Sequence, residues 1–218
     1  MNTTYDALIL VSFGGPEGPD DVMPFLENVL KGRDVPRQRM LTVAEHYMAF
    51  GGVSPINEDN RSLVSLLESE LGDHDMSLPI YFGNRNWHPM LSDTLGRMKQ
   101  DGIRRALAIV TSGYGSYSSC RQYLENLEEA RKGIGEGAPE VDKLRLFFNH
   151  PGFLESMVAC TDRALLQVDQ ERRQDCRLLF TAHSIPITMS VGCRYAEQLE
   201  ETARFVAAET GISNWKMV

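Results

Sequence analysis

The sequence predicts an α/β fold with a mostly parallel sheet. Short apolar runs of strand length alternate with amphipathic stretches along the whole chain, which is the pattern of parallel strands joined by crossover helices. The chain has 218 residues, 42% of them hydrophobic, enough to bury a sizeable core. We expect two doubly wound units, the second beginning at about Ala106, with no long linker between them.

The first part of the chain opens with the apolar run Ala7–Val11, a predicted buried strand. A turn-rich loop, Ser12–Pro19, follows it. A second strand is expected at Leu78–Gly83. The amphipathic stretches between and after these strands predict helices at about 20–32, 36–50, 55–72 and 89–102.

The second part repeats the alternation, with strands expected at Ala106–Thr111, Leu144–Phe148 and Leu178–Ala182. Helices are expected at about 120–131 and 151–168, and a last one closes at Gly211. The final residues, Trp215–Val218, begin one more strand. Since a parallel strand needs a neighbour and a crossover, we expect the chain to be part of a longer protein.

Composition narrows the class of protein. The formal net charge is -8, which disfavours a general role in binding nucleic acid, because that role needs a basic surface. No apolar run approaches the roughly 20 residues that span a bilayer, and the first residues lack the basic region of a signal peptide. We therefore expect no transmembrane segment and a cytoplasmic protein. Its four cysteines, without zinc-ligand spacing, are expected to be free thiols.

The strand Leu178–Ala182 ends at His183, followed by Ser184, Ile185 and Pro186. Ligands of open parallel sheets bind outside the carboxyl ends of the strands, so this histidine stands where chemistry is usually done. A neutral imidazole binds metal ions and carries protons near pH 7. The alternative is a histidine that is merely hydrogen-bonded at the end of a strand.

Two other segments offer side chains to a ligand. The loop after the third strand places Tyr114, Tyr117 and Tyr123 among serines, which suits a flat aromatic ligand bearing carboxylates. For any one of these tyrosines, ordinary packing at a sheet edge is the simpler explanation. Ser54, before Pro55, is either a helix N-cap or a hydroxyl that faces a ligand. The glycines after the first strand match no phosphate-binding motif.

Four motifs together resemble the ferrochelatase family, most closely its bacterial members that act on coproporphyrin. They run in order over nearly the whole chain. They are Ser12-Phe13-Gly14-Gly15-Pro16, Phe50-Gly51-Gly52-Val53-Ser54-Pro55-Ile56-Asn57, Tyr81-Phe82-Gly83-Asn84-Arg85-Asn86-Trp87 and Thr181-Ala182-His183-Ser184-Ile185-Pro186. The resemblance implies two Rossmann-like halves, residues 1–103 and a truncated 104–218, with a porphyrin held in the cleft between them and the C-terminal part missing.

By the same resemblance the protein inserts ferrous iron, its substrate metal, into coproporphyrin III or, as second choice, protoporphyrin IX. His183 corresponds to the catalytic histidine at the metal site, and Ser54 and Tyr123 to residues that contact the porphyrin. Lys31, Arg33 and the helix around His46 flank that region and add weaker attraction for carboxylates.

The chain departs from the family pattern at two points. Several relatives have tyrosine where this chain has Phe13, so that position supplies no oxygen ligand to iron. The acidic partner of the family's histidine lies beyond the point that corresponds to Val218.

Some relatives hold a 2Fe-2S cluster with one mid-chain cysteine and three near the C-terminus, and Cys160 stands near the place of the first. A cysteine packed on a helix is the alternative. We also expect a monomer.

Two other functions remain open at this stage. One is insertion of cobalt or nickel into another tetrapyrrole, since histidine binds several divalent ions. The other is a non-catalytic module that binds haem or porphyrin and delivers it to a partner.

Overall fold

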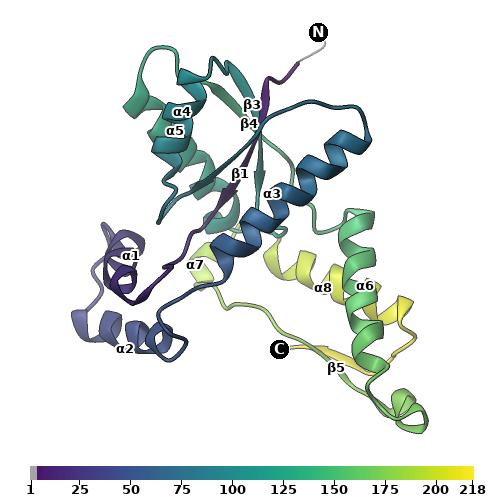
Figure 1. Ribbon diagram of the computed structural model, residues 1–218. Coiled ribbons are helices and arrows are strands. Elements are labelled where there is room, and N and C mark those ends of the chain that lie inside the picture. Colours follow the sequence, from purple (N-terminus) through teal and green to yellow (C-terminus); the bar gives the residue numbers. More distant parts are fainter. Residues whose placement is uncertain (1–3) are drawn as a thin grey trace. The chain divides into compact units, whose positions relative to one another are not determined.

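The computed structural model describes residues 4–218, apart from the side chain of Gln174, and its strands pair in parallel. The predicted α/β class is confirmed (Figure 1). The strands are β1 (Ala7–Ser12), β2 (Ile80–Asn84), β3 (Arg105–Val110), β4 (Glu140–Lys143), β5 (Leu178–Phe180) and β6 (Trp215–Met217). The α-helices are α1 (Val22–Leu30), α2 (Arg37–Met48), α3 (Ile56–Asp73), α4 (Leu91–Gln100), α5 (Gln122–Ile134), α6 (Pro151–Leu165), α7 (Ile187–Ser190) and α8 (Tyr195–Glu209). Short 3-10 helices cover Pro19–Asp21 and Gln170–Asp175, and a π-helix covers Tyr117–Arg121.

The larger sheet has the strand order β2-β1-β3-β4. All six residues of β1 are buried, and Leu8 pairs with Ile80 on one side and Leu107 on the other. The chain crosses from β1 to β2 on one side and then returns past β1 to β3. Strand order therefore reverses at β1, and the loops after β1 and β3 leave the sheet at its switch point, where open α/β sheets bind ligands.

Hydrophobic side chains cover this sheet. The odd-numbered residues of β1, such as Ile9, pack with Leu95 and Met98 of α4 and with Leu127 of α5. A second cluster joins α1 to α2. The leucines of α3 are less well covered, since Leu66 is 68% exposed.

The strand predicted at Leu144–Phe148 is wrong, because the fourth strand is β4, which ends at Lys143. A salt bridge of 2.6 Å joins Arg105 of β3 to Asp142 of β4, and pairing stops after Leu144 donates its backbone N–H to the carbonyl of Ala108. The apolar residues that suggested a strand serve another purpose. Phe147 packs edge-on against Phe153 of α6, with ring centroids 5.3 Å apart.

The chain divides into two compact units. The first is Met1–Thr111 with Tyr123–Leu144, and the second is Ser112–Gln122 with Arg145–Val218. The first therefore contains the whole four-stranded sheet. The division into Rossmann-like halves, residues 1–103 and a truncated 104–218, stays a prediction.

The second unit contains the two-stranded sheet β5-β6 and helices α6 and α8, which pack side by side (Figure 1). The expected strand around Leu178 and the expected strand at Trp215 are confirmed, since Leu178 pairs with Trp215. None of the three residues of β5 is buried. Leu179 is 60% exposed, because within the described residues β5 has a strand neighbour on one side only.

Candidate functional site

Ser54 lies between α2 and α3, against the loop that follows β1. Its backbone N–H donates to the carbonyl of Pro16 at 2.8 Å, and an isolated bridge joins Glu17 to Val53. Its Oγ lies 3.5 Å from the backbone nitrogen of Ile56, the long limit of a hydrogen bond, and the residue is partly buried. The weak capping contact leaves the Ser54 hydroxyl available to a ligand.

A close approach of two loops explains the glycine at position 15. A Cβ atom there would lie 2.6 Å from the Cβ and 2.7 Å from the Oγ of Ser54, and 2.8 Å from Cγ2 of Ile56, all closer than real Cβ contacts. Only glycine lets the loop after β1 reach Ser54. The Gly-Gly pair of the first motif is thus a packing requirement of the candidate site.

A buried amide network holds the same loops in place. The Asn57 side chain, 1% exposed, donates from Nδ2 to the carbonyls of Gly15 at 3.2 Å and His88 at 3.1 Å. Its Oδ1 accepts a hydrogen bond of 2.9 Å from Nδ2 of Asn84, which also donates to the carbonyl of His88. The network ties α3 to the loops after β1 and β2. Sequence reasoning missed its role, although both asparagines stand inside the quoted motifs.

Tyr123 lies in the first turn of α5 and is 5% exposed, within the core under the sheet. The Arg85 guanidinium lies over its ring, 4.9 Å from the centroid, and 5.5 Å from the ring centroid of Phe13. Burial raises the pKa of Tyr123, and the charge of Arg85 opposes that rise. Tyr123 is therefore a neutral, packed tyrosine. Arg85, which the sequence analysis did not select, is positioned by two aromatic rings after the end of β2.

His183 is the third residue after the end of β5 and is exposed. Its Nδ1 lies 2.7 Å from the carbonyl oxygen of Ser184. A carbonyl only accepts, so Nδ1 carries a proton, and in the neutral form of the ring the lone pair is on Nε2. That tautomer suits a ring nitrogen that takes up a proton or holds a metal ion.

Comparison with known proteins decides the family. A family model described as Ferrochelatase matches residues 5–218. The chain belongs to the ferrochelatase family. It is 54% identical over 214 residues to a ferrochelatase of Rhodopirellula baltica, and 48% identical over 221 residues to a coproporphyrin III ferrochelatase of Nocardia farcinica. The match covers 98% of this chain in both, but 61% and 63% of those proteins, so the chain spans about three fifths of the length of the relatives.

The two compact units of this ferrochelatase-family chain divide the predicted site residues between them. Ser54 and Tyr123 belong to the first unit, and His183 and Cys160 to the second. Within the first unit, the loop after β1 contacts both Ser54 and, through Phe13, the guanidinium that lies over Tyr123. These assignments as porphyrin or metal residues stay predictions.

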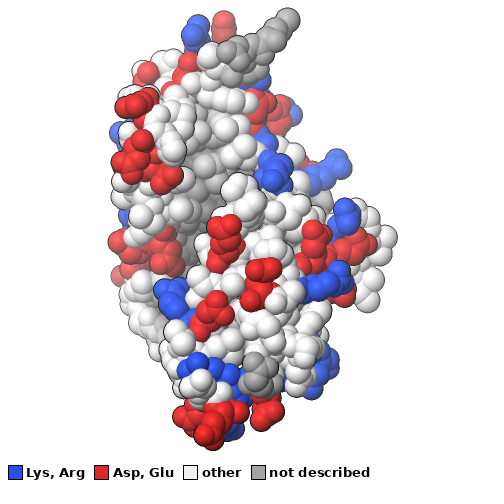
Figure 2. Space-filling view, turned by 90° about the vertical axis from the view of Figure 1, so that its right-hand side faces the viewer, with Lys and Arg blue, Asp and Glu red and all other residues white. Residues whose placement is uncertain are grey.

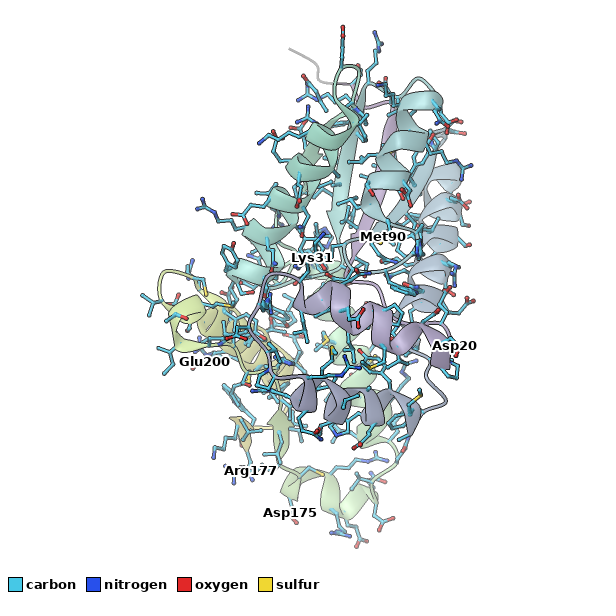
Figure 3. The ribbon with its side chains drawn as sticks, turned by 90° about the vertical axis from the view of Figure 1, so that its left-hand side faces the viewer. Asp20, Lys31, Met90, Asp175, Arg177 and Glu200 are labelled. Atoms are coloured by element: carbon cyan, nitrogen blue, oxygen red, sulfur yellow. The ribbon has the colours of Figure 1, made fainter. Side chains whose placement is uncertain are left out.

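The basic residues expected to flank the site lie on the first two helices. Lys31 caps the end of α1 and Arg33 follows it, both exposed, as Figure 3 shows for Lys31. His46 is an exposed residue in the last turn of α2. Elsewhere, on the face seen in Figure 2, basic side chains are interspersed with acidic ones. Lys31 and Arg33 are therefore available to carboxylates.

Cys160 is an exposed thiol on α6, and its Sγ accepts a hydrogen bond of 3.1 Å from Arg163. A 2Fe-2S cluster needs four such ligands. Over the part of the chain that the structure describes, no group of three or more histidine, cysteine or acidic side chains is placed to hold a metal ion. The residues present do not by themselves form a cluster site.

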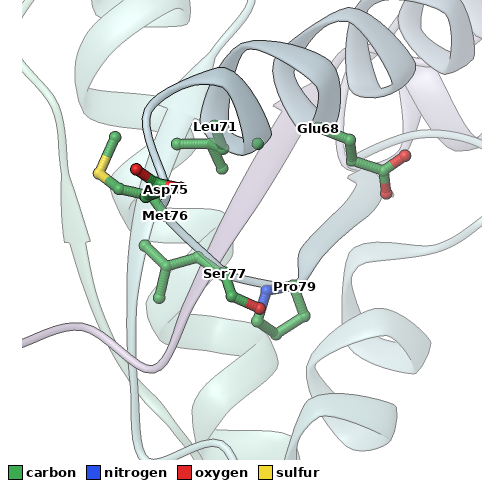
Figure 4. A pocket seen from close by; sticks show the side chains of 8 residues that line it. Glu68, Leu71, Asp75, Met76, Ser77 and Pro79 are labelled. Atoms are coloured by element: carbon green, nitrogen blue, oxygen red, sulfur yellow. The ribbon is translucent and has the colours of Figure 1, made fainter.

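A hollow of about 650 Å³ lies at the far end of α3, between that helix and the residues leading into β2 (Figure 4). Its lining includes Leu71, Asp75, Met76 and Pro79. Leu71 is 15 residues beyond Ile56, the first residue of α3, about 22 Å along the helix. None of the predicted site residues lines this hollow, so it is separate from the candidate site. Among the described residues, no helix has the length and hydropathy to cross a membrane.

Proposed function

We propose that the protein carrying this chain inserts ferrous iron into coproporphyrin III. The observation that carries the proposal is membership of the ferrochelatase family over residues 5–218. Relatives from Nocardia farcinica and Streptomyces coelicolor, 48% and 47% identical, are named coproporphyrin III ferrochelatases. The position of His183 after β5 supports the proposal, because ligands of open α/β sheets bind outside the carboxyl ends of parallel strands.

His183 is the residue we assign to the chemistry. Insertion replaces two pyrrole N–H protons with one ferrous ion, so the site must remove protons and present a partly dehydrated cation. Because Nδ1 donates to Ser184, the neutral ring has its lone pair on Nε2, which accepts a proton or binds the metal, one at a time. The second proton needs another acceptor, which the resemblance places beyond Val218.

Ser54 and Tyr123 are the residues we assign to the porphyrin. The Ser54 hydroxyl is weakly engaged at 3.5 Å and suits a hydrogen bond to a propionate. Tyr123 is almost fully buried, so its contact is limited to the edge that remains accessible. Lys31, Arg33 and, when protonated, His46 add positive charge in the same unit. Several cations favour coproporphyrin III, which has four carboxylates, over protoporphyrin IX, which has two.

Optical assays with the protein that contains this chain separate the alternatives. Ferrous iron, cobalt and nickel are each offered with coproporphyrin III and with protoporphyrin IX, under anaerobic conditions. The proposal predicts the highest kcat/KM for ferrous iron with coproporphyrin III. A preference for cobalt or nickel would identify another tetrapyrrole chelatase. Tight porphyrin binding without insertion of any metal would identify a binding module.

Three further expectations belong to the complete protein and stay predictions. They are the cytoplasmic location, the monomeric state, and Cys160 as one ligand of a 2Fe-2S cluster. Iron and sulfide analysis of the purified protein tests the last. A cluster requires two irons and two sulfides per chain, and their absence would leave Cys160 as an ordinary surface thiol.

A further inference from the structure

The segment that carries His183 has little regular structure of its own. Residues 181–186 lie between β5 and the short helix α7, and all of them except Ile185 are exposed. Exposed loop backbone usually has low local stability. A catalytic side chain on such a segment needs a tie to a rigid element if its ring is to keep one position.

Tyr195, the first residue of α8, supplies such a tie. Its hydroxyl donates to the backbone carbonyl of His183 at 3.1 Å. Its ring packs edge-on against Tyr114, with centroids 6.4 Å apart and planes at 89°. Partial burial raises the pKa of Tyr195, so the hydroxyl keeps its proton and stays a donor at neutral pH. The contact holds the backbone of the histidine and leaves its imidazole unobstructed.

The helix that carries Tyr195 is itself fixed along the same face. Gln198 and Thr202 follow Tyr195 at i+3 and i+7, which places the three side chains on one side of α8. The Oε1 of Gln198 accepts a buried hydrogen bond of 2.7 Å from the backbone N–H of Gly115, and the Thr202 hydroxyl donates to the carbonyl of Phe148 at 3.3 Å. Three loops of the second unit are therefore tied to one helix face, and the hydroxyl of Tyr195 is the contact that reaches His183.

We propose that Tyr195 is a positioning residue for His183, which it holds through the backbone without touching the substrate. The inference rests on the proposed function in that His183 is the residue assigned to the chemistry. Because the hydroxyl acts on the orientation of the imidazole, its removal lowers the rate of the chemical step more than it weakens binding of the porphyrin.

The test is Tyr195→Phe, which keeps the ring against Tyr114 and deletes only the hydroxyl. The matched control is Tyr81→Phe in the first unit, which deletes a tyrosine hydroxyl that donates to Asp101 at 2.8 Å. We expect kcat for metal insertion to fall about tenfold in Tyr195→Phe, as for the loss of one hydrogen bond, with KM within about twofold of wild type. The control keeps both constants.

A second measurement does not depend on activity. The ring 13Cε1 resonance of His183 is assigned by its disappearance in His183→Ala and compared between wild type and Tyr195→Phe at one pH. A shifted or broadened resonance is expected in Tyr195→Phe alone. Unchanged kcat and an unchanged resonance would overturn the inference. If the wild-type protein inserts no metal, the proposed function fails, and the resonance still decides whether Tyr195 positions His183.

Discussion

Asn57 and Asn60 offer a sharp test of the buried network that supports Ser54, because both lie on α3 and, among the described residues, the Nδ2 of Asn57 has hydrogen-bond partners and that of Asn60 has none. Asn57 makes three side-chain hydrogen bonds, to Gly15, His88 and Asn84. Asn60 is 5% exposed, and its Nδ2 has no hydrogen-bond partner among the described residues. Replacement by leucine, of similar volume, removes the amide at either position.

Three hydrogen bonds at about 1 kcal/mol each give a loss of about 3 kcal/mol in the free energy of unfolding for Asn57→Leu. For a protein of about this size, that loss lowers Tm by roughly 6–12 °C, and the shift is smaller for a larger protein. Asn60→Leu removes an unsatisfied buried amide, so we expect a free energy of unfolding equal to or above that of wild type.

Urea unfolding of the protein that contains this chain, followed by far-UV circular dichroism, measures both variants. The difference between them is the informative quantity, since both replace an amide with an alkyl group on one helix. Equal losses for the two variants would show that the network between α3 and the loops after β1 and β2 contributes no specific stability. Porphyrin affinity should also fall in Asn57→Leu, because Gly15 borders Ser54.

Two further predictions follow from the first unit. Gly15→Ala places a methyl group 2.6 Å from Cβ of Ser54. We therefore expect the free energy of unfolding to fall by about 1–3 kcal/mol and porphyrin titration to show weaker binding. Gly18→Ala is the control and should match wild type, because its methyl group meets nothing within 4 Å. The Asp6 carboxylate accepts hydrogen bonds from the backbone N–H groups of Arg104 and Arg105, which lower its pKa. The stabilisation that the Asp6 carboxylate provides is present above its unfolded pKa of about 3.9 and is lost as pH falls through the lower folded pKa. Asp6→Asn lacks this titrating group. Its Tm, measured by calorimetry, should therefore fall less than that of wild type over this acidic range. An equal acid dependence would show that Asp6 contributes nothing through these bonds.

The sequence predicted well the strands that consist mainly of apolar residues. β1 is an unbroken apolar run with both faces covered, and β3 is similarly apolar, so strand length and composition suffice. β4 was misplaced because its residues, Glu140–Lys143, are polar, whereas the apolar Phe147 and Phe148 belong to an aromatic cluster of the second unit. No local pattern distinguishes an apolar run that pairs from one that packs against a helix.

Some residues of the candidate site could likewise be selected from the sequence, and others could not. His183 could be selected because it ends an apolar run and stands in a specific motif. The roles of Asn57, Arg85 and Tyr195 depend on partners 12 or more residues away, such as Gly15, Tyr123 and His183. Those contacts exist only after the chain has folded, and asparagine, arginine and tyrosine are ordinary residues at their positions. Sequence spacing alone therefore gave no reason to select them.

His183 is the residue that we propose for metal insertion. Its most direct test is anaerobic single-turnover insertion of ferrous iron into coproporphyrin III by wild type and His183→Ala, with porphyrin binding measured by fluorescence in the same samples. We expect the variant to bind coproporphyrin III with nearly wild-type affinity and to lose insertion by at least about a hundredfold, the typical contribution of a positioned acid-base group. Insertion at the wild-type rate by His183→Ala would contradict it.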